Sequence, residues 1–369
     1  MNVHNSPVRI LHVFGIMNCG GAETFIMNVY RNIDREKIQF DFIVHSEDKG
    51  YYDDEIEALG GTIYSIPKFK GKNIREYIKS WNVFFDTYKD YQIIHSHIRS
   101  TASVFLSMAK KRGIITIIHS HNTSSGKGII ATIKNLLQLP LRKISHYRFA
   151  CSIDAGEWLY GKKKFEVMNN AIDAKKFTFD QSTRDRYRKE LELVDKFVVG
   201  HIGRFHEQKN HEFLLDMFKS LNTKHPNTVL LLIGDGDLRY TIERKIIKLG
   251  LQNSVVLLGV RSDIPQLLQA IDVFAFPSIY EGLGIVVIEA QAAGLPCVIS
   301  DVVPSEVGIT DLVKFISLKE NPEYWAKEVI TSRDSNIRKS TFEKIKKANY
   351  DVKDQVKLLE DFYLKISIE

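Results

Sequence analysis

A glycine-containing turn within residues 278–290 has the residue types of a phosphate-binding loop. It follows an apolar run at 273–276, typical of a buried strand, and leads into a helical pattern. Gly284 would let the backbone turn tightly and come close to a ligand. The amides of Gly284, Ile285 and Val286 would then be unpaired N–H groups at a helix N-terminus, where phosphate binds well. The segment predicts a site for a phosphorylated ligand; the alternative is a capping turn.

Two carboxylates flank the same turn. Glu281 precedes it, and Glu289 lies about one turn into the expected helix. The two side chains would therefore lie on either side of a bound diphosphate without touching each other. An ionised carboxylate only accepts hydrogen bonds, which suits the hydroxyl groups of a sugar or a ribose. The alternative is that both glutamates are solvated.

A pair of cations follows the apolar run at 197–201. Arg204 and Lys209 lie five residues apart, in a loop before an expected helix. A guanidinium offers a planar fork and an ammonium a compact charge, so the pair could hold two phosphates. A surface loop with two exposed cations is the alternative.

A third loop contains Gly20 and Gly21, followed by Glu23. It comes after the first expected strand, at 8–14, and opens a helix. It could cradle a phosphate of the same ligand, but it lacks the full dinucleotide-binding fingerprint. A glycine pair at such a place is often only a turn.

Four histidines follow two neighbouring expected strands: His95, His97, His119 and His121. Because the carboxyl ends of parallel strands meet at one edge of a sheet, this grouping favours a binding site over four separate structural roles. No carboxylate or cysteine in that region completes a zinc ligand set. Asp235 and Asp237 resemble a carboxylate pair for a divalent cation, but a strand-to-helix turn explains them better. We therefore expect no metal and no cofactor.

Positive charge gathers in one part of the chain. Between Tyr91 and Ile153 there are nine Lys and Arg residues and no Asp or Glu, although the net charge of the whole chain is only +6. A region of one sign attracts an anionic partner such as phosphate, anionic lipid or nucleic acid. The chain has no recognisable nucleic-acid-binding motif, so we expect no nucleic acid partner.

Within that stretch, residues 127–144 have apolar residues at helical spacing, and Pro140 should bend or break the helix. The same segment contains four basic residues: Lys127, Lys134, Arg142 and Lys143. The pattern predicts a helix that rests on an anionic membrane and meets a lipid-linked sugar acceptor. The alternative is a core helix with ordinary surface lysines.

The elements that position these residues alternate between short apolar runs and helical patterns, which predicts parallel sheets covered on both faces. A charged segment at 180–196 interrupts the alternation, which then restarts. We therefore predict an α/β chain of two doubly wound, Rossmann-like domains, at residues 1–185 and 186–369, with a last helix able to pack back on the first domain. Ligands of such sheets bind at the carboxyl ends of the strands, here in a cleft between the domains.

Composition is that of a globular protein, with 44% hydrophobic and 26% charged residues. Cys19, Cys151 and Cys297 lie far apart, which favours a reducing compartment over a disulfide framework. The first residues do not resemble a signal peptide, and the apolar runs are well below the roughly 18 residues that a membrane span needs. We therefore expect a cytoplasmic protein, peripheral on the inner face of the cell membrane where the basic stretch binds it.

Taken together, the motifs resemble family 4 of the retaining glycosyltransferases, which have the GT-B fold. The resemblance covers nearly the whole chain and is greatest for members that build bacterial capsule or exopolysaccharide. It depends on these residues, in the order of the family: Gly20-Gly21-Ala22-Glu23, His121, Gly203-Arg204, Lys209-Asn210, and Glu281 with Glu289. One departure is Ala171, where many relatives have glycine, and it affects the acceptor side more than the donor side.

The resemblance implies a role for each residue. Arg204 and Lys209 would hold the donor diphosphate, and Glu289 the ribose hydroxyls. Glu281 would contact the donor sugar beneath its reacting face. His121 would hydrogen-bond the sugar and support the developing positive charge through its backbone carbonyl. The cations and helix amides would neutralise the leaving diphosphate, so that no metal is needed.

The implied function is a retaining, metal-independent transfer of a hexose or N-acetylhexosamine. The donor would be a nucleotide sugar, a UDP-sugar by family habit, and the acceptor a glycan or a polyprenyl-linked sugar. Two alternatives stay open. A nucleotide-sugar epimerase would need acid and base groups on both sides of the sugar ring. A non-catalytic, nucleotide-sugar-binding subunit would have no need for all of the motif residues.

Overall fold

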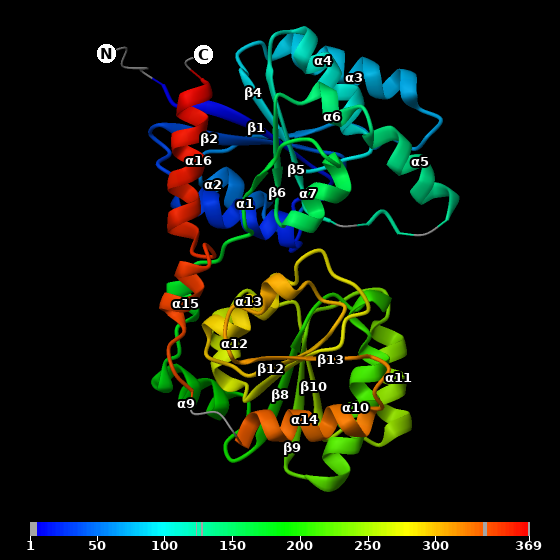
Figure 1. The fold of residues 1–369 in the computed structure, drawn as a ribbon, viewed down its shortest axis with the longest axis vertical. Coiled ribbons are helices and arrows are strands. Elements are labelled where there is room, and N and C mark those ends of the chain that lie inside the picture. Colours follow the sequence, from blue (N-terminus) through cyan, green and yellow to red (C-terminus); the bar gives the residue numbers. More distant parts are fainter. Residues whose placement is uncertain (1–5, 123, 127, 335–337, 368–369) are drawn as a thin grey trace. The chain divides into compact units, whose positions relative to one another are not determined.

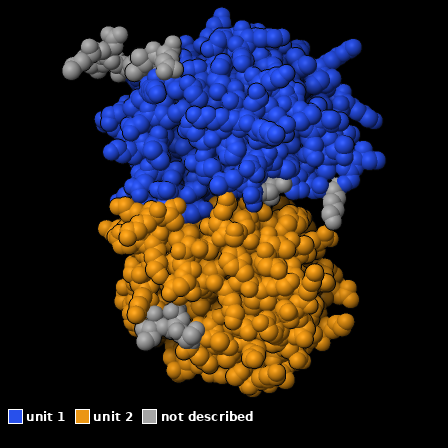
Figure 2. All heavy atoms as spheres, viewed as in Figure 1, with its two compact units in different colours: residues 1–172, 349–369 blue, residues 173–348 orange. Residues whose placement is uncertain are grey.

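The chain folds into two compact units, each built on a parallel sheet (Figure 1). The structure is a computed structural model that describes residues 6–122, 124–126, 128–334 and 338–367. The first unit comprises residues 1–172 and 349–369, and the second comprises residues 173–348 (Figure 2). The predicted α/β class, with two doubly wound domains, is confirmed.

The first unit contains a seven-stranded sheet in the order β3-β2-β1-β4-β5-β6-β7. Its strands are β1 (Val8–Phe14), β2 (Ile38–Val44), β3 (Ile63–Ser65), β4 (Ile93–Ser96), β5 (Ile115–Ser120), β6 (Tyr147–Ala150) and β7 (Glu166–Val167). Strand β1 pairs in parallel with both β2 and β4. The strand order reverses at β1 and β4, and this switch point is where ligands of doubly wound sheets bind.

Helices cover both faces of this sheet because alternate strand residues point to opposite sides. Ile10 of β1 belongs to one core and Leu11 to the other. The helices of this unit are α1 (Gly21–Asn32), α2 (Asp53–Ala58), α3 (Ile74–Thr87), α4 (Ala102–Lys111), α5 (Ile129–Gln138), α6 (Leu141–Ile144), α7 (Ile153–Tyr160) and α16 (Val352–Ile366). No described helix is long and apolar enough to cross a membrane, and no disulfide joins Cys19, Cys151 and Cys297.

The C-terminal helix α16, red in Figure 1, packs on α1 and is part of the first unit. Its apolar face is buried in the core that α1 and the sheet share, through Val352, Leu359 and Tyr363. Ala171, the departure from the family pattern, is fully buried in the same core. It is not among the described non-glycine residues with positive φ, so this position does not need a glycine.

The second unit contains a six-stranded sheet in the order β10-β9-β8-β11-β12-β13, with its switch point between β8 and β11. The strands are β8 (Phe197–Ile202), β9 (Thr228–Ile233), β10 (Val255–Gly259), β11 (Val273–Phe276), β12 (Cys297–Ser300) and β13 (Val313–Ile316). The helices are α8 (Ala174–Phe177), α9 (Gln181–Glu190), α10 (His211–Lys224), α11 (Arg239–Leu249), α12 (Ile264–Ala270), α13 (Ile285–Ala292), α14 (Pro322–Asp334) and α15 (Phe342–Lys347), with short 3-10 turns η1 (Glu207–Lys209) and η2 (Ser305–Val307).

The predicted domain boundary needs correction. The units divide after Ile172, before the expected boundary at residue 185. Residues 349–369 belong to the first unit, in agreement with the prediction that the last helix packs back on the first domain. The charged segment is not a linker: it forms α9, which packs on α12. Arg184 and Arg188 both pair with Asp272, which follows α12. The charges therefore attach the segment to the second unit.

Candidate functional site

The best-defined candidate site lies at the switch point of the second sheet, where the loops after β8 and β11 meet. Lys209 Nζ lies 2.6 Å from Glu281 Oε1, and the two residues are 72 positions apart in the chain. Their side chains are only 16% and 7% exposed. Gln208, which sequence reasoning missed, donates to Glu281 Oε2 at 3.2 Å and to the Tyr280 carbonyl at 2.9 Å. The structure thus brings together two of the predicted donor-site residues and adds a third.

An aromatic ring and a glycine complete this end of the sheet. Lys209 Nζ lies 4.6 Å from the ring centroid of Phe276, the last residue of β11, which is a cation–π distance. A Cβ placed on Gly284 would lie 3.6 Å from the Phe276 ring and 3.8 Å from Glu281 Cγ. Gly284 has φ +87°, a left-handed conformation that glycine adopts without strain. The cation, the carboxylate and the start of α13 therefore border the same space.

Helix α13 begins at Ile285, with Gly284 as its N-cap, as the sequence predicts. No side chain caps this end. Val287 donates to the Gly284 carbonyl at 2.9 Å, whereas the N–H groups of Ile285 and Val286 have no recorded partner among the described residues. Unpaired amides at a helix N-terminus, next to a lysine, form a binding place for a phosphate group.

Glu289 lies in the second turn of α13. Burial raises the pKa of its carboxyl group to about 8, so the group holds a proton at neutral pH in the ligand-free protein. No hydrogen bond or ion pair of this side chain is recorded among the described residues. A partly buried carboxyl group with a raised pKa and no protein partner among the described residues is a candidate ligand contact.

Arg204 is not brought to the Lys209–Glu281 pair. Its guanidinium lies 3.3 Å from Asp237 Oδ2, and both side chains are largely exposed. Asp235 pairs with Arg239 at 3.2 Å. The turn that holds the two aspartates packs tightly on the Arg204 loop: a Cβ on Gly234 would lie 2.1 Å from the Gly203 carbonyl oxygen. Each aspartate thus has an arginine partner, which fits the predicted turn better than a metal pair.

The glycine loop of the first unit opens α1, with Gly20 as the N-cap and Gly21 as the first helical residue. Space around Gly21 is open, whereas a Cβ on Gly20 would lie 2.2 Å from Glu23 Oε2. The Glu23 side chain therefore folds back over the first glycine. Burial raises its pKa to about 7. The loop is compatible with a close backbone approach by a ligand at Gly21.

His121 lies directly after β5, at the carboxyl edge of the first sheet, as predicted. Its Nε2 is 2.9 Å from His97 Nδ1, and His97 Nε2 is in turn 3.0 Å from His12 Nδ1. Burial, with a smaller opposing effect from Asn170, lowers the pKa of His121 to about 3. The imidazole is therefore neutral at physiological pH. The neutral ring can donate one hydrogen bond and accept another, but it brings no positive charge to the reaction.

The basic segment forms a helix with an exposed apolar face. Pro140 ends it as predicted, separating α5 from α6. Ile129 is 80% and Leu136 61% exposed, and only Ala131 and Gln138 of α5 are buried, so the alternative of a core helix is wrong. The four predicted basic residues differ in exposure. Lys134 and Lys143 are exposed, whereas Arg142 is partly buried and donates to the Leu159 carbonyl at 3.0 Å. Lys127 lies outside the described residues.

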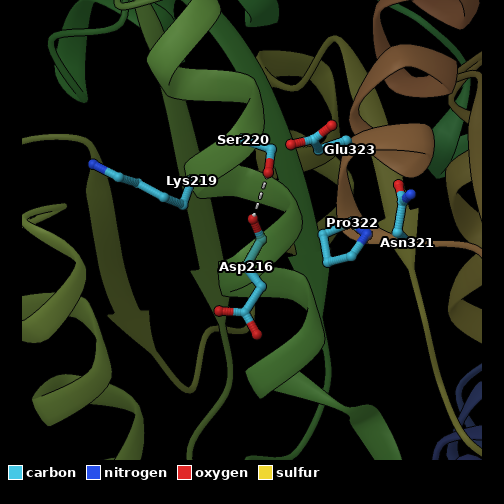
Figure 3. A pocket seen from close by; sticks show the side chains of 6 residues that line it. All are labelled: Asp216, Lys219, Ser220, Asn321, Pro322 and Glu323. Carbon is cyan, nitrogen blue, oxygen red and sulfur yellow. Dashed lines mark hydrogen bonds between the residues drawn. The ribbon is translucent and has the colours of Figure 1, made fainter.

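A surface hollow in the second unit is lined by α10 and the start of α14 (Figure 3). Ser220 donates to the Asp216 carbonyl at 3.3 Å, and the Asp216 carboxylate pairs with Lys245 at 2.7 Å. None of the predicted site residues lines it. We therefore assign it no ligand.

Two doubly wound units, one with a lysine, a carboxylate and a free helix N-terminus at its switch point, define the architecture of a GT-B glycosyltransferase. Comparison with solved structures agrees. HepE of Anabaena, crystallised with UDP and glucose, superposes with a TM-score of 0.80 over 97% of this chain and 100% of its own, at 19% sequence identity. The predicted GT-B fold is confirmed.

The sequence comparisons identify the family. The model described as Glycosyltransferase Family 4 matches residues 19–176, and the model described as Glycosyl transferases group 1 matches residues 183–350. The glycosyltransferase EpsF of Bacillus subtilis is 34% identical over 98% of this chain and 97% of its own length. The chain belongs to family 4 of the glycosyltransferases, as the motifs predicted.

Two further relatives have more specific names. One is the UDP-Gal:α-D-GlcNAc-diphosphoundecaprenol α-1,3-galactosyltransferase of Escherichia coli, 27% identical over 82% of this chain and 81% of that protein. The other is the capsular polysaccharide biosynthesis glycosyltransferase CapH of Staphylococcus aureus, 24% identical over 89% of this chain and 94% of that protein.

Proposed function

We propose that this glycosyltransferase moves a hexose or N-acetylhexosamine from a UDP-sugar to a lipid-linked sugar acceptor during synthesis of a bacterial capsule or exopolysaccharide. It acts with retention of configuration and without a metal. The observation that carries the proposal is the Lys209–Glu281 pair beside the free N-terminus of α13. The names of the E. coli and S. aureus relatives support the donor, the acceptor class and the pathway.

The pair suits a diphosphate leaving group. In the ligand-free protein Glu281 neutralises Lys209 and holds its ammonium near the start of α13. A donor diphosphate that binds the free amides of Ile285 and Val286 would draw Lys209 toward itself and leave Glu281 to accept from sugar hydroxyls. Fixed cations and amides then stabilise the charge that develops as the glycosidic bond breaks. This is the work that a divalent ion would otherwise do.

Retention fits the scarcity of bases in one part of the first unit. The stretch from Tyr91 to Ile153 in the first unit has no carboxylate. His121 is neutral, but its Nε2 is already hydrogen-bonded to His97. A leaving phosphate oxygen that takes the acceptor proton needs no such base, and the incoming hydroxyl then attacks the face that the diphosphate leaves.

The first prediction concerns the donor. In a panel of UDP-, GDP- and ADP-sugars, with a polyprenyl-diphosphate-linked sugar as acceptor and a chelator present, we expect nucleotide release from UDP-sugars only. Release should be lost in Glu281→Ala. Two outcomes would contradict the proposal: an epimerised donor without nucleotide release, or tight donor binding with no turnover across the panel. The first would indicate an epimerase and the second a binding subunit.

The second prediction concerns the membrane. We expect the exposed apolar face of α5, with Lys134 and Lys143, to bind vesicles of anionic lipid. The double variant Ile130→Ser/Leu136→Ser should bind at least about tenfold more weakly, because each buried apolar side chain contributes about 1.5–3 kcal/mol. Lys134→Gln/Lys143→Gln should bind more weakly on anionic vesicles but change little on neutral ones. Vesicle co-sedimentation measures both.

A matched control is Ile247→Ser on α11, because Ile247 is 62% exposed and lies in the other unit. Its vesicle binding should equal that of the wild type. Unchanged binding of the α5 double variant would remove the support for a membrane-bound acceptor and leave a soluble glycan as the acceptor class.

A further inference from the structure

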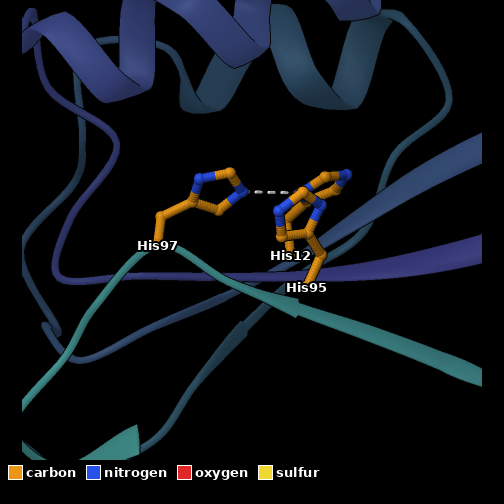
Figure 4. Close-up of side chains that lie close together, drawn as sticks. All are labelled: His12, His95 and His97. Carbon is orange, nitrogen blue, oxygen red and sulfur yellow. Dashed lines mark hydrogen bonds between the residues drawn. The ribbon is translucent and has the colours of Figure 1, made fainter. Parts of the chain in front are cut away.

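Five histidine rings stack in the first unit, at the carboxyl ends of three neighbouring strands. His12 comes from β1, His95 and His97 from the end of β4, and His119 and His121 from the end of β5. The rings of His119 and His121 have centroids 4.1 Å apart, and those of His95 and His97 4.4 Å apart. Figure 4 shows His97 hydrogen-bonded to His12, with His95 beside them.

The cluster contains ring nitrogens without a well-formed hydrogen bond. Both nitrogens of His119 and Nδ1 of His121 are buried in this state, and each such atom costs about 1–3 kcal/mol in a protein interior. His45 shows the usual arrangement in the same unit, because its nitrogens bond to the Phe14 carbonyl and the Tyr77 hydroxyl. His119 has a contact with the Met168 backbone and His121 has one with the Asn170 side chain, but neither is a well-formed hydrogen bond. His119 therefore has a nitrogen available to a ligand, and His121 Nε2 becomes available when its bond to His97 opens.

We propose that His97, His119 and His121 bind one late first-row transition-metal ion of the Zn²⁺ type. One nitrogen of each lies within 4.8 Å of the other two. A tetrahedral ion with Zn–N bonds of about 2.0–2.1 Å separates neighbouring nitrogens by about 3.3 Å. The ligand atoms of His97 and His121 would be Nδ1 and Nε2, which now share a hydrogen bond at 2.9 Å and would move apart by about 0.4 Å around the ion. Three imidazoles with a fourth, open position are an established zinc ligand set.

The surroundings of the triad fit this ion. One of the two nitrogens in the His97–His121 hydrogen bond would give up its proton when the ion binds, so that both can act as ligands. His97 keeps its bond to His12, which orients the ring as an outer partner of a metal ligand does. His97 and His121 are 8% and 9% exposed, which leaves an edge for a water or hydroxide in the fourth position.

The neighbouring triad of His12, His95 and His97 suits an ion less well. His12 and His95 are fully buried, and His95 Nδ1 is occupied by the Tyr363 hydroxyl at 2.6 Å. A divalent ion there would have no access to water for a fourth position.

Metal binding at this place has a consequence for activity. Because His121 would be held as a ligand, an ion should block its hydrogen bond to the donor sugar and inhibit transfer. This consequence rests on the proposed function, whereas binding of the ion does not. The site would act as an inhibitory one in an enzyme whose reaction needs no metal.

The test is a titration of the full-length, tag-free, metal-stripped protein with Zn²⁺ by calorimetry and with Co²⁺ by visible absorption. We expect one ion per chain and the intense bands of four-coordinate Co²⁺. His119→Phe keeps an aromatic ring in the stack and breaks no well-formed hydrogen bond. It should weaken binding at least about 100-fold, because losing a direct ligand exceeds the 10–100-fold cost of losing an outer partner.

His95→Phe is the matched control, since it removes a ring of the same stack that is not a ligand. Its affinity should stay within about threefold of the wild type, and near-UV circular dichroism should show that both variants are folded. No binding by the wild-type protein overturns the proposal. So does unchanged binding by His119→Phe, or a loss confined to His95→Phe, which would place the ion in the inner triad.

A parallel assay separates the site from the proposed function. Zn²⁺ should inhibit transfer by the wild-type enzyme and a chelator should restore it, whereas His119→Phe, measured against its own metal-free rate, should resist inhibition. If Zn²⁺ binds with the expected ligands but transfer continues, the metal site stands and the role of His121 in transfer is wrong.

Discussion

Replacing Lys209 by methionine is expected to lower kcat/KM for the donor by about 10²–10³-fold, the usual cost of removing one group that stabilises developing negative charge. The Lys209 side chain is only 16% exposed, and its ammonium pairs with Glu281, whose Cγ would lie 3.8 Å from a Cβ on Gly284, the N-cap of α13. Its charge therefore acts on a bound diphosphate with little screening by water. Methionine keeps most of the apolar stem and a favourable contact with Phe276. Steady-state rates with the UDP-sugar that the panel identifies give the measurement.

The same substitution should also lower stability, because it leaves the Glu281 carboxylate buried without its cation. Removing one partner of a buried ion pair typically costs about 3–5 kcal/mol. Adding Glu281→Gln should recover much of that loss in urea unfolding, but it should not recover activity. This pattern separates the electrostatic role in catalysis from a simple loss of folding.

Lys245→Met is the matched control. Lys245 is also a partly buried lysine that pairs with a carboxylate in the second unit, at 2.7 Å from Asp216, but it lies away from the switch point. Its kcat/KM should stay within about twofold of the wild type. A Lys209→Met enzyme that keeps more than a third of the wild-type kcat/KM would exclude a diphosphate-binding role for this lysine.

The sequence predicted the loops of the candidate site because their signals are local. A glycine turn between a strand and a helix specifies its own geometry, so Gly284 lies at the N-cap of α13 where the pattern places it. The first strand, Val8–Phe14, agrees residue for residue with the expected one. The family motifs added what local patterns lack, namely that these loops serve one ligand.

Contacts between distant segments were not predictable in this way. Phe276 is one apolar residue of a buried strand, and only the folded chain places its ring under Lys209. His12 looks like an interruption in an apolar run, and Tyr363 reaches His95 across 268 positions. The predicted domain boundary was wrong for a related reason. The charge of a segment does not reveal whether its side chains are solvated or, like Arg184 with the partly buried Asp272, paired within one unit.

The expectation that the chain holds no metal also depended on residues that are close together in the sequence. A search for carboxylates or cysteines near His119 finds none in the sequence, which argued against zinc. The site that we propose needs neither, because His97 follows the neighbouring strand β4 and His121 follows β5, the strand that contains His119, and one nitrogen of each lies within 4.8 Å of the others. Spacing along the chain carries no information about imidazoles that converge across a sheet.

Replacing Glu289 by glutamine is expected to stabilise the ligand-free protein above neutral pH. The carboxyl pKa rises from 4.5 to about 8 on folding. Between these values the folded state holds a proton that the unfolded state has lost, so wild-type stability falls as pH rises, by up to about 1.4 kcal/mol per pH unit. Glutamine does not titrate. Urea unfolding should therefore show no advantage for the variant near pH 4.5 and a gain of about 2–4 kcal/mol at pH 8.

The same variant should bind UDP about 10–100-fold more weakly at pH 8, because a hydrogen bond to a charged group contributes about 1.5–3 kcal/mol and the amide offers one acceptor oxygen in place of two. Glu212→Gln, on the exposed side of α10, should change neither quantity. A stability difference that is the same at pH 4.5 and pH 8 would show that Glu289 is not protonated in the folded protein. Higher stability together with weaker UDP binding, in contrast, is the result expected of a residue kept for its ligand: under the proposed function the ribose hydroxyls, rather than a protein group, are the partners of this partly buried acid.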